Sequence, residues 1–159
     1  MIFAVIGVIA IIIFIASGIS AKRYKQVTYD YDPVEYFGLS AIEIEFVRLV
    51  NEHRINLGLN PFIVEELASK VCYYQNLEDI KLGVPSSHNH WDRMRREAKV
   101  NLDNCGHIHS NNHSTAQKLF QSYMDSKEGH KEQLQHLKRT HIGISFYQRR
   151  SHILITKYE

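Results

Sequence analysis

Histidine is the most conspicuous source of chemistry in this chain, because ten of its 159 residues are histidines. Imidazole is a common metal ligand, and its charge changes between about pH 5 and 8. Cys105, His107 and His109 alternate along one short stretch. Alternate residues of a strand project from one face, so these three side chains would point the same way. The sequence therefore raises a divalent metal such as zinc as a candidate cofactor, without making any cofactor certain.

The two cysteines, Cys72 and Cys105, have neither CxxC nor zinc-finger spacing. A disulfide between them could form if the domain lies outside the cytoplasm. A pair of buried thiols is the alternative, and the sequence does not separate the two. Catalysis by Cys105 is disfavoured, since no orienting Asn or Asp is evident beside a candidate base.

The composition is that of a globular protein, with 44% hydrophobic and 23% charged residues. A formal net charge of only +2 argues against a nucleic-acid partner, which requires a concentrated basic face. Enough apolar material is present for one compact domain with its own core.

The first 25 residues are expected to be a membrane anchor. Residues 2–21 are almost entirely apolar and carry no charge, and about 20 such residues span a bilayer as a helix. A cleaved signal peptide is disfavoured because no basic region precedes the apolar run, and Ile19-Ser20-Ala21 makes a poor cleavage site. We therefore expect one retained helix with a basic flank over 1–25 and a polar, aromatic linker over 26–39.

Helices dominate the first half of the remaining chain. Ser40 and Glu43 form a capping box that begins a helix, and Gly58 follows its end. A second helix is expected over 64–82, with Gly83 as its stop. The residues expected to face inward from this second helix are Leu67, Val71, Tyr74 and Leu77.

Strands are expected in the part of the chain that follows these helices. A short helix is expected over 91–98, a strand over 102–109, a helix capped by Ser114, and a short helix near Leu134. Two alternating stretches, 141–147 and 152–158, flank a turn at 148–151 and predict a hairpin. From the third helix the side chains expected to face inward are Ala116, Leu119, Phe120 and Tyr123. This order predicts an α+β domain over 40–159.

Four motifs in this domain, taken together in their order, resemble the CAP superfamily (SCP-like proteins), especially its short bacterial branch. They are Asn51-x-x-Arg54 followed by Gly58-Leu59-x-Pro61, Ser87-His88 followed by Trp91 and Arg93, Tyr123 followed by Ser126-x-x-Gly129-His130, and Ile142-Gly143-Ile144. The resemblance implies an α-β-α sandwich around a small, mostly antiparallel sheet. It also implies structural roles for Asn51, Arg54, Gly58, Pro61, Arg93, Tyr123, Gly129 and Gly143.

The resemblance also implies a central cleft in which two histidines and two glutamates can bind a metal. His88 and His130 stand at the histidine positions. The glutamate positions fall on Gly106 and Ser126, so two carboxylates are missing. His107 and Glu128 are candidate substitutes, although motif alignment does not place Glu128 at the site. Without carboxylates, a bound dication loses charge compensation and a general base disappears.

The family implies no single activity, because proteins that share a fold can carry different functional sites. The missing glutamates favour a non-catalytic binding or interaction module with a protein partner, such as a subunit of a membrane complex. The alternatives are a metal-dependent hydrolase of peptide or cell-envelope substrates and a binder of lipid or small apolar ligands. The resemblance favours a domain outside the cytoplasm, whereas Lys22, Arg23 and Lys25 favour the opposite side by the positive-inside rule. We take the outward orientation as the expectation.

Overall fold

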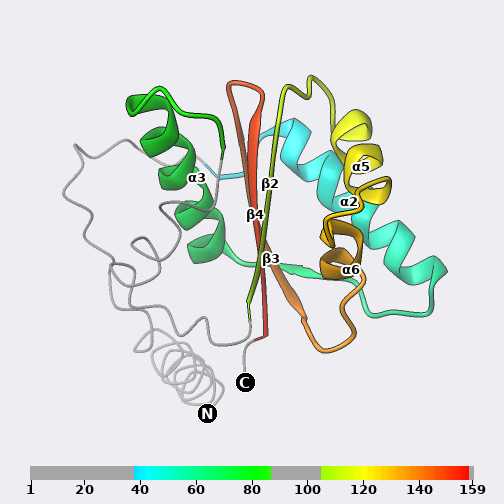
Figure 1. The fold of residues 1–159 in the computed structure, drawn as a ribbon. Helices are drawn as coiled ribbons and strands as arrows, with labels where there is room; N and C mark the ends of the chain where they lie inside the picture. Colours follow the sequence, from blue (N-terminus) through cyan, green and yellow to red (C-terminus); the bar gives the residue numbers. More distant parts are fainter. Residues whose placement is uncertain (1–37, 87–104, 158–159) are drawn as a thin grey trace, which may run out of the picture. The chain divides into compact units, whose positions relative to one another are not determined.

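The computed structural model describes residues 38–86 and 105–157 (Figure 1). The helices and strands follow one another as α2 (Ala41–Asn56), β1 (Ile63–Val64), α3 (Glu66–Lys81), β2 (Gly106–Asn111), α5 (Ala116–Met124), α6 (His130–Leu134), β3 (His141–Tyr147) and β4 (Arg150–Thr156). The expected anchor over 1–25, most of the linker over 26–39 and the expected helix over 91–98 lie outside the described residues. No described helix has the length and apolar character needed to cross a bilayer.

The four strands form one sheet in the order β1-β3-β4-β2. The short β1 is parallel to β3, and the other two pairings are antiparallel. In Figure 1, α3 covers one face of this sheet, and α2, α5 and α6 lie on the other. The expected α-β-α sandwich with a mostly antiparallel sheet is therefore confirmed for the described domain.

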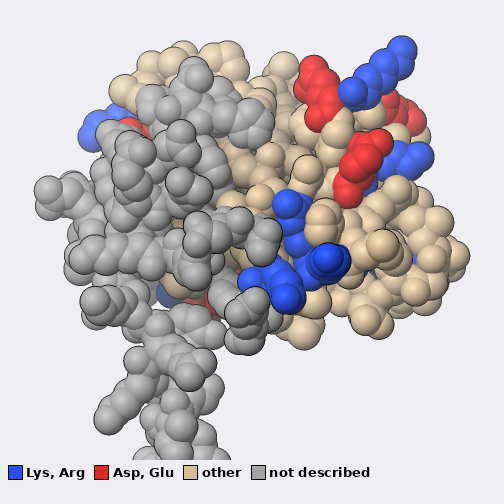
Figure 2. Space-filling view, turned by 60° about the horizontal axis from the view of Figure 1, so that its bottom comes forward, with Lys and Arg blue, Asp and Glu red and all other residues tan. Residues whose placement is uncertain are grey.

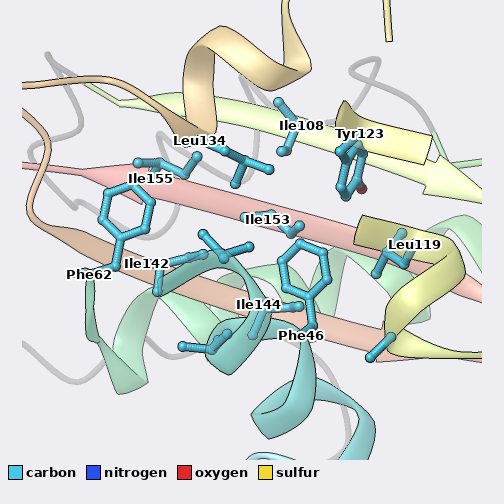
Figure 3. Packing of buried hydrophobic residues seen from close by; sticks show 13 residues of the cluster. Phe46, Phe62, Ile108, Leu119, Tyr123, Leu134, Ile142, Ile144, Ile153 and Ile155 are labelled. Atoms are coloured by element: carbon cyan, nitrogen blue, oxygen red, sulfur yellow. The ribbon is translucent and has the colours of Figure 1, made fainter. Parts of the chain in front are cut away.

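The apolar core fills the space between the sheet and the α2–α5–α6 layer (Figure 3). Its fully buried members include Phe46, Leu119, Leu134, Ile144 and Ile153. The expected inward residues of α5 fit this picture, since Ala116, Leu119 and Tyr123 are buried and Phe120 is partly buried. Burial of this apolar surface is the main force that holds the layer on the sheet.

The capping box that begins α2 is confirmed and also reaches the sheet. The Ser40 backbone N–H donates to the Glu43 carboxylate at 2.6 Å. The other oxygen of the same carboxylate accepts from the backbone N–H of Phe146 in β3, also at 2.6 Å. Glu43 is only 6% exposed, so one buried carboxylate caps the helix and fixes it to the sheet.

The predicted face of α3 is wrong. Of the residues expected inward, only Val71 is buried, whereas the buried side of α3 is largely polar: Ser69, Cys72, Gln75, Asn76 and Asp79. The physical reason lies in the sheet, which presents Gly143, Ser145 and His152 to this helix. A Cβ at Gly143 would lie 2.5 Å from the Ser69 nitrogen, so helix and strand are in backbone contact.

Strand boundaries also differ from the sequence prediction. The final strand is Arg150–Thr156 rather than 152–158, because the hairpin turns through only Gln148 and Arg149. Both have positive φ, 47° and 65°, as a tight two-residue turn requires. Strand β2 continues to Asn111, since each of its residues pairs with β4.

The cap of α5 is also corrected. Thr115, not Ser114, caps this helix, since its hydroxyl accepts from the Lys118 N–H at 3.2 Å. On α2, His53 is partly buried and shares a 2.8 Å hydrogen bond with Gln135.

Candidate functional site

The first family-like motif has a structural role at the end of α2. The Asn51 amide donates to the Phe62 carbonyl at 3.0 Å and accepts from the Phe62 N–H at 2.7 Å. Gly58 begins the intervening loop with a φ of +73°, a conformation that favours glycine. Pro61 lies exposed just before Phe62. These residues fix the path from α2 into β1.

Arg54 is a buried clamp between two loops. Its side chain is 1% exposed and donates to the carbonyls of Asn60 at 2.8 Å and Leu134 at 2.7 Å. The guanidinium lies 3.7 Å from the centre of the Phe62 ring, a cation–π contact. Burial lowers the pKa of this guanidinium. Arg54 therefore ties the α2–β1 loop to the segment after α6.

The motif around Gly129 positions His130 beside Tyr123. Gly129 has a φ of +84° and forms the N-cap of α6, so His130 is the first residue of that helix. The His130 ring meets the Tyr123 ring edge-on, with centroids 5.3 Å apart. Tyr123 is buried, and its hydroxyl shares a 2.8 Å hydrogen bond with Ser151. Burial raises the pKa of Tyr123, so its hydroxyl stays protonated and a neutral ring packs against His130.

A buried carboxylate and two imidazoles form a chain between α3 and the sheet. Nε2 of His152 lies 2.9 Å from Oδ2 of Asp79, and both side chains are fully buried. Nδ1 of His152 lies 2.9 Å from Nε2 of His107. The two rings are coplanar within 2°, with centroids 5.1 Å apart, so they meet edge to edge through this hydrogen bond. Gln75 donates to the other oxygen of Asp79 at 3.0 Å.

This chain determines where the protons lie. With Asp79 as a carboxylate, His152 donates from Nε2, and a neutral His152 then accepts at Nδ1. His107 then donates from Nε2, so the chain fixes the tautomer and the orientation of both rings.

Further imidazoles lie beside this chain. His109 follows His107 on the same face of β2, with ring centroids 6.1 Å apart, as the alternation predicted. The His130 ring of α6 lies 6.5 Å from that of His109. Strands β2 and β4 and helix α6 thus bring four histidines together at one edge of the sheet. His88 and Arg93 lie outside the described residues.

Two members of this group, His152 and Asp79, were not predicted from the sequence. His152 is fully buried at the centre of the chain, although no sequence motif marked it. Asp79 was not singled out, because it lies on the side of α3 expected to face solvent. A sequence signal for His152 is that it directly precedes the apolar run Ile153-Leu154-Ile155.

Comparisons with known proteins agree on the fold. No protein-family model and no curated protein sequence matches the chain. Among solved structures, a cysteine-rich secretory protein from Staphylococcus aureus matches with a TM-score of 0.65 and 15% identity, over 72% of this chain and 38% of its own. An extracellular protein with an SCP domain from Bacillus anthracis matches with a TM-score of 0.64 and 15% identity, over 77% of this chain and 45% of its own. This chain has the CAP fold.

An outer surface protein from Borrelia burgdorferi is similar over more of its own length. Its TM-score is 0.64 and its identity 17%, and the match covers 73% of this chain and 92% of that protein. The chain thus spans less than half of the first two neighbours and most of the third. The CAP resemblance inferred from the four motifs is confirmed at the level of the fold.

The CAP-fold domain has no carboxylate at Gly106 or Ser126, the two positions where the resemblance implies glutamates. A Cβ at Gly106 would overlap the ends of the Gln133 and Arg139 side chains, so these flexible ends would have to move before a carboxylate could stand here. Ser126 accepts a hydrogen bond from the Glu128 N–H at 3.1 Å and forms a local turn. The Glu128 side chain is 83% exposed, and its carboxylate lies 3.9 Å from Nε2 of His130.

The donor set does not fit a closed metal centre. Within residues 38–86 and 105–157, no three side chains of His, Cys, Asp or Glu are grouped so that they could hold a metal ion. His107 is already engaged with His152, and Glu128 is mostly in solvent. The described residues therefore offer an oriented imidazole, but not the carboxylate-rich site that a metal-dependent hydrolase needs.

Proposed function

We propose that this chain is a non-catalytic binding module, held at a membrane by residues 2–21, with its CAP-fold domain outside the cytoplasm and bound to a protein partner. The observation that carries this proposal is the lack of a carboxylate at Gly106, where the ends of the Gln133 and Arg139 side chains lie instead. The neighbours in structure support the location, since they are described as secretory, extracellular and outer surface proteins.

An exposed apolar patch supports a role in binding. Ile55, Leu57 and Leu137 are 58%, 50% and 78% exposed, which is high for large apolar side chains. Arg54 holds their two loops together, since it donates to Leu134 and lies directly before Ile55. Figure 2 faces the end of the domain where these loops lie and shows a broad uncharged area between acidic and basic groups. An apolar centre with a charged rim is typical of protein interfaces.

A hydrolase is the second candidate, because the Asp79–His152–His107 chain holds an imidazole in a fixed orientation at the edge of the sheet. His130 and the separate His88 would then have to supply a metal or substrate contact. The structure favours binding over this role, since the carboxylates that would complete such a site are replaced at Gly106 and Ser126.

The first experiment separates these functions on the full chain in lipid nanodiscs. Zinc is titrated calorimetrically into the wild type and into the His88→Ala/His130→Ala double variant. We expect no binding at micromolar zinc and no difference between the two proteins. Micromolar binding that disappears in the double variant, together with metal-dependent peptide hydrolysis, would refute the proposed function. Lipid that co-purifies with the domain after release from its anchor would instead favour a lipid binder.

The second experiment tests the patch in cells. A photo-crosslinking residue is placed at Leu137 and, as a matched control, at Leu82, which is 50% exposed at the end of α3. We expect a discrete crosslinked protein from position 137 only, and its loss in Ile55→Glu. Equal crosslinking from both positions would argue against this patch. A reporter fused after Glu159 tests the side of the membrane, since activity of a cytoplasm-restricted reporter contradicts the outward orientation.

A further inference from the structure

Both cysteines of the chain lie in one small cluster. Cys72 is fully buried on α3 and packs with Ala68 and Leu154. Cys105, half-buried directly before β2, packs against the same cluster. Both are in the thiol form. The sequence left open whether these residues form a disulfide or remain buried thiols, and the structure adds that they are neighbours.

We propose that Cys72 and Cys105 are a dithiol redox site, which closes to an intramolecular disulfide on reaction with an external disulfide and locks α3 to the start of β2. The sheet holds both cysteines in place. The thiol of Cys72 donates to the Gly143 carbonyl at 3.7 Å, and Gly106, next to Cys105, pairs with Ile155 in β4. The two cysteines thus lie next to the same part of the sheet.

The surroundings assign different roles to the two sulfurs. Burial raises the pKa of Cys72 far above its usual range, and the negative charges of Glu43 and a Cys105 thiolate raise it further. Cys72 is therefore a poor first nucleophile. Cys105 is half-buried, whereas Cys72 is fully buried, so Cys105 is the attacking thiol.

The reaction balances with a small-molecule disulfide as the oxidant. The Cys105 thiolate attacks one sulfur of this disulfide, which forms a mixed disulfide and releases one thiolate. The Cys72 sulfur then attacks the Cys105 sulfur, and the second thiolate leaves with the proton of Cys72 as a thiol. Two protein thiols are oxidised to one disulfide, and the external disulfide is reduced to two thiols.

The new bond would close a covalent ring around residues 73–104. This ring contains the motif with His88 and Arg93. It is already fastened at one point, because the Ser86 N–H donates to the Asn111 side chain in β2 at 3.0 Å. A disulfide removes conformational freedom from the unfolded chain, so oxidation should stabilise the domain.

The test uses the full chain in nanodiscs and a glutathione redox buffer, with intact mass as the readout. We expect the oxidised wild type to lose two hydrogens, remain monomeric on a non-reducing gel and melt several degrees higher. Cys72→Ser should stop at a mixed disulfide with one glutathione on Cys105, whereas Cys105→Ser should react at least tenfold more slowly. Stable glutathione adducts on the wild type, or a disulfide-linked dimer in place of the internal bond, would overturn the proposal.

A kinetic comparison keeps the proposal testable if a serine variant does not fold. The wild-type chain is oxidised once in its native state and once unfolded in guanidinium. Because the native fold holds the two cysteines together, the internal disulfide should form at least tenfold faster in the native state. An equal or slower native rate would show that the fold keeps the two sulfurs apart and would refute the redox site.

Discussion

Replacement of Gly143 by alanine tests the contact that places α3 on the sheet. The added methyl group would overlap the backbone carbon and the side chain of Ala68 and lie 2.5 Å from the backbone nitrogen of Ser69. A helix backbone cannot move aside as a flexible side chain does, so α3 as a whole must shift. Extra atoms in a packed interior cost about 1 to 3 kcal/mol, and a backbone clash belongs at the upper end, about 3 kcal/mol.

Gly106→Ala is the matched control, because it lies in the same sheet and its new methyl group would also overlap neighbouring atoms. Those atoms are the ends of the Gln133 and Arg139 side chains, which can rotate away. We therefore expect a loss of only about 1 kcal/mol at this position. Urea unfolding followed by circular dichroism measures both losses. A loss for Gly143→Ala that equals or falls below that of Gly106→Ala would refute the reasoning.

Three further predictions concern the clamp, the imidazole chain and pH. Arg54→Met should lower the free energy of unfolding by about 3 kcal/mol in urea titrations, because buried carbonyls lose their donors. Asp79→Leu and His152→Leu should each cost about 3 to 5 kcal/mol, but the double variant less than their sum, in a double-mutant cycle. Burial lowers the pKa of His136 below 6.5, so the unfolded chain binds this proton first as the pH falls. The contribution of His136 to stability should thus be complete above about pH 6.5 and decline below it, and denaturation at several pH values should show a flatter profile for His136→Gln.

Local signals in the sequence predicted those elements whose bonds are also local. The capping box of Ser40 and Glu43 was found where it was expected, because both partners lie within one helical turn. The alternation of His107 and His109 correctly predicted a shared face, since a strand has a fixed period of two. The order of helices and strands and the four motifs were enough to identify the fold.

Long-range pairing explains the errors. The start of β4 depends on a turn that takes only Gln148 and Arg149, and nothing local distinguishes this turn from a longer one. The buried face of α3 depends on what the sheet presents to it. Since the helix meets Gly143 at backbone distance and Ser145 beside it, an amide such as Asn76 is better placed there than leucine. A hydrophobic pattern cannot reveal a helix face that is stabilised by hydrogen bonds.

The two helical layers therefore contribute differently to this domain. The α2–α5–α6 side holds the apolar core and supplies stability. Its buried polar side chains make hydrogen bonds to other elements: Arg54 to the Leu134 carbonyl and Glu43 to the Phe146 N–H. The α3 side has only a small apolar cluster and instead buries Asp79, Gln75 and Asn76. A buried polar layer costs more to desolvate than an apolar one, and each hydrogen bond within it offsets part of that cost. The Asp79–His152–His107 chain supplies such hydrogen bonds, and in doing so it brings an oriented imidazole to the edge of the sheet near His130. The position of Asp79 in this CAP-fold domain thus follows from the way α3 is attached to the sheet, so the contact at Gly143 should also control the geometry of the Asp79–His152 pair.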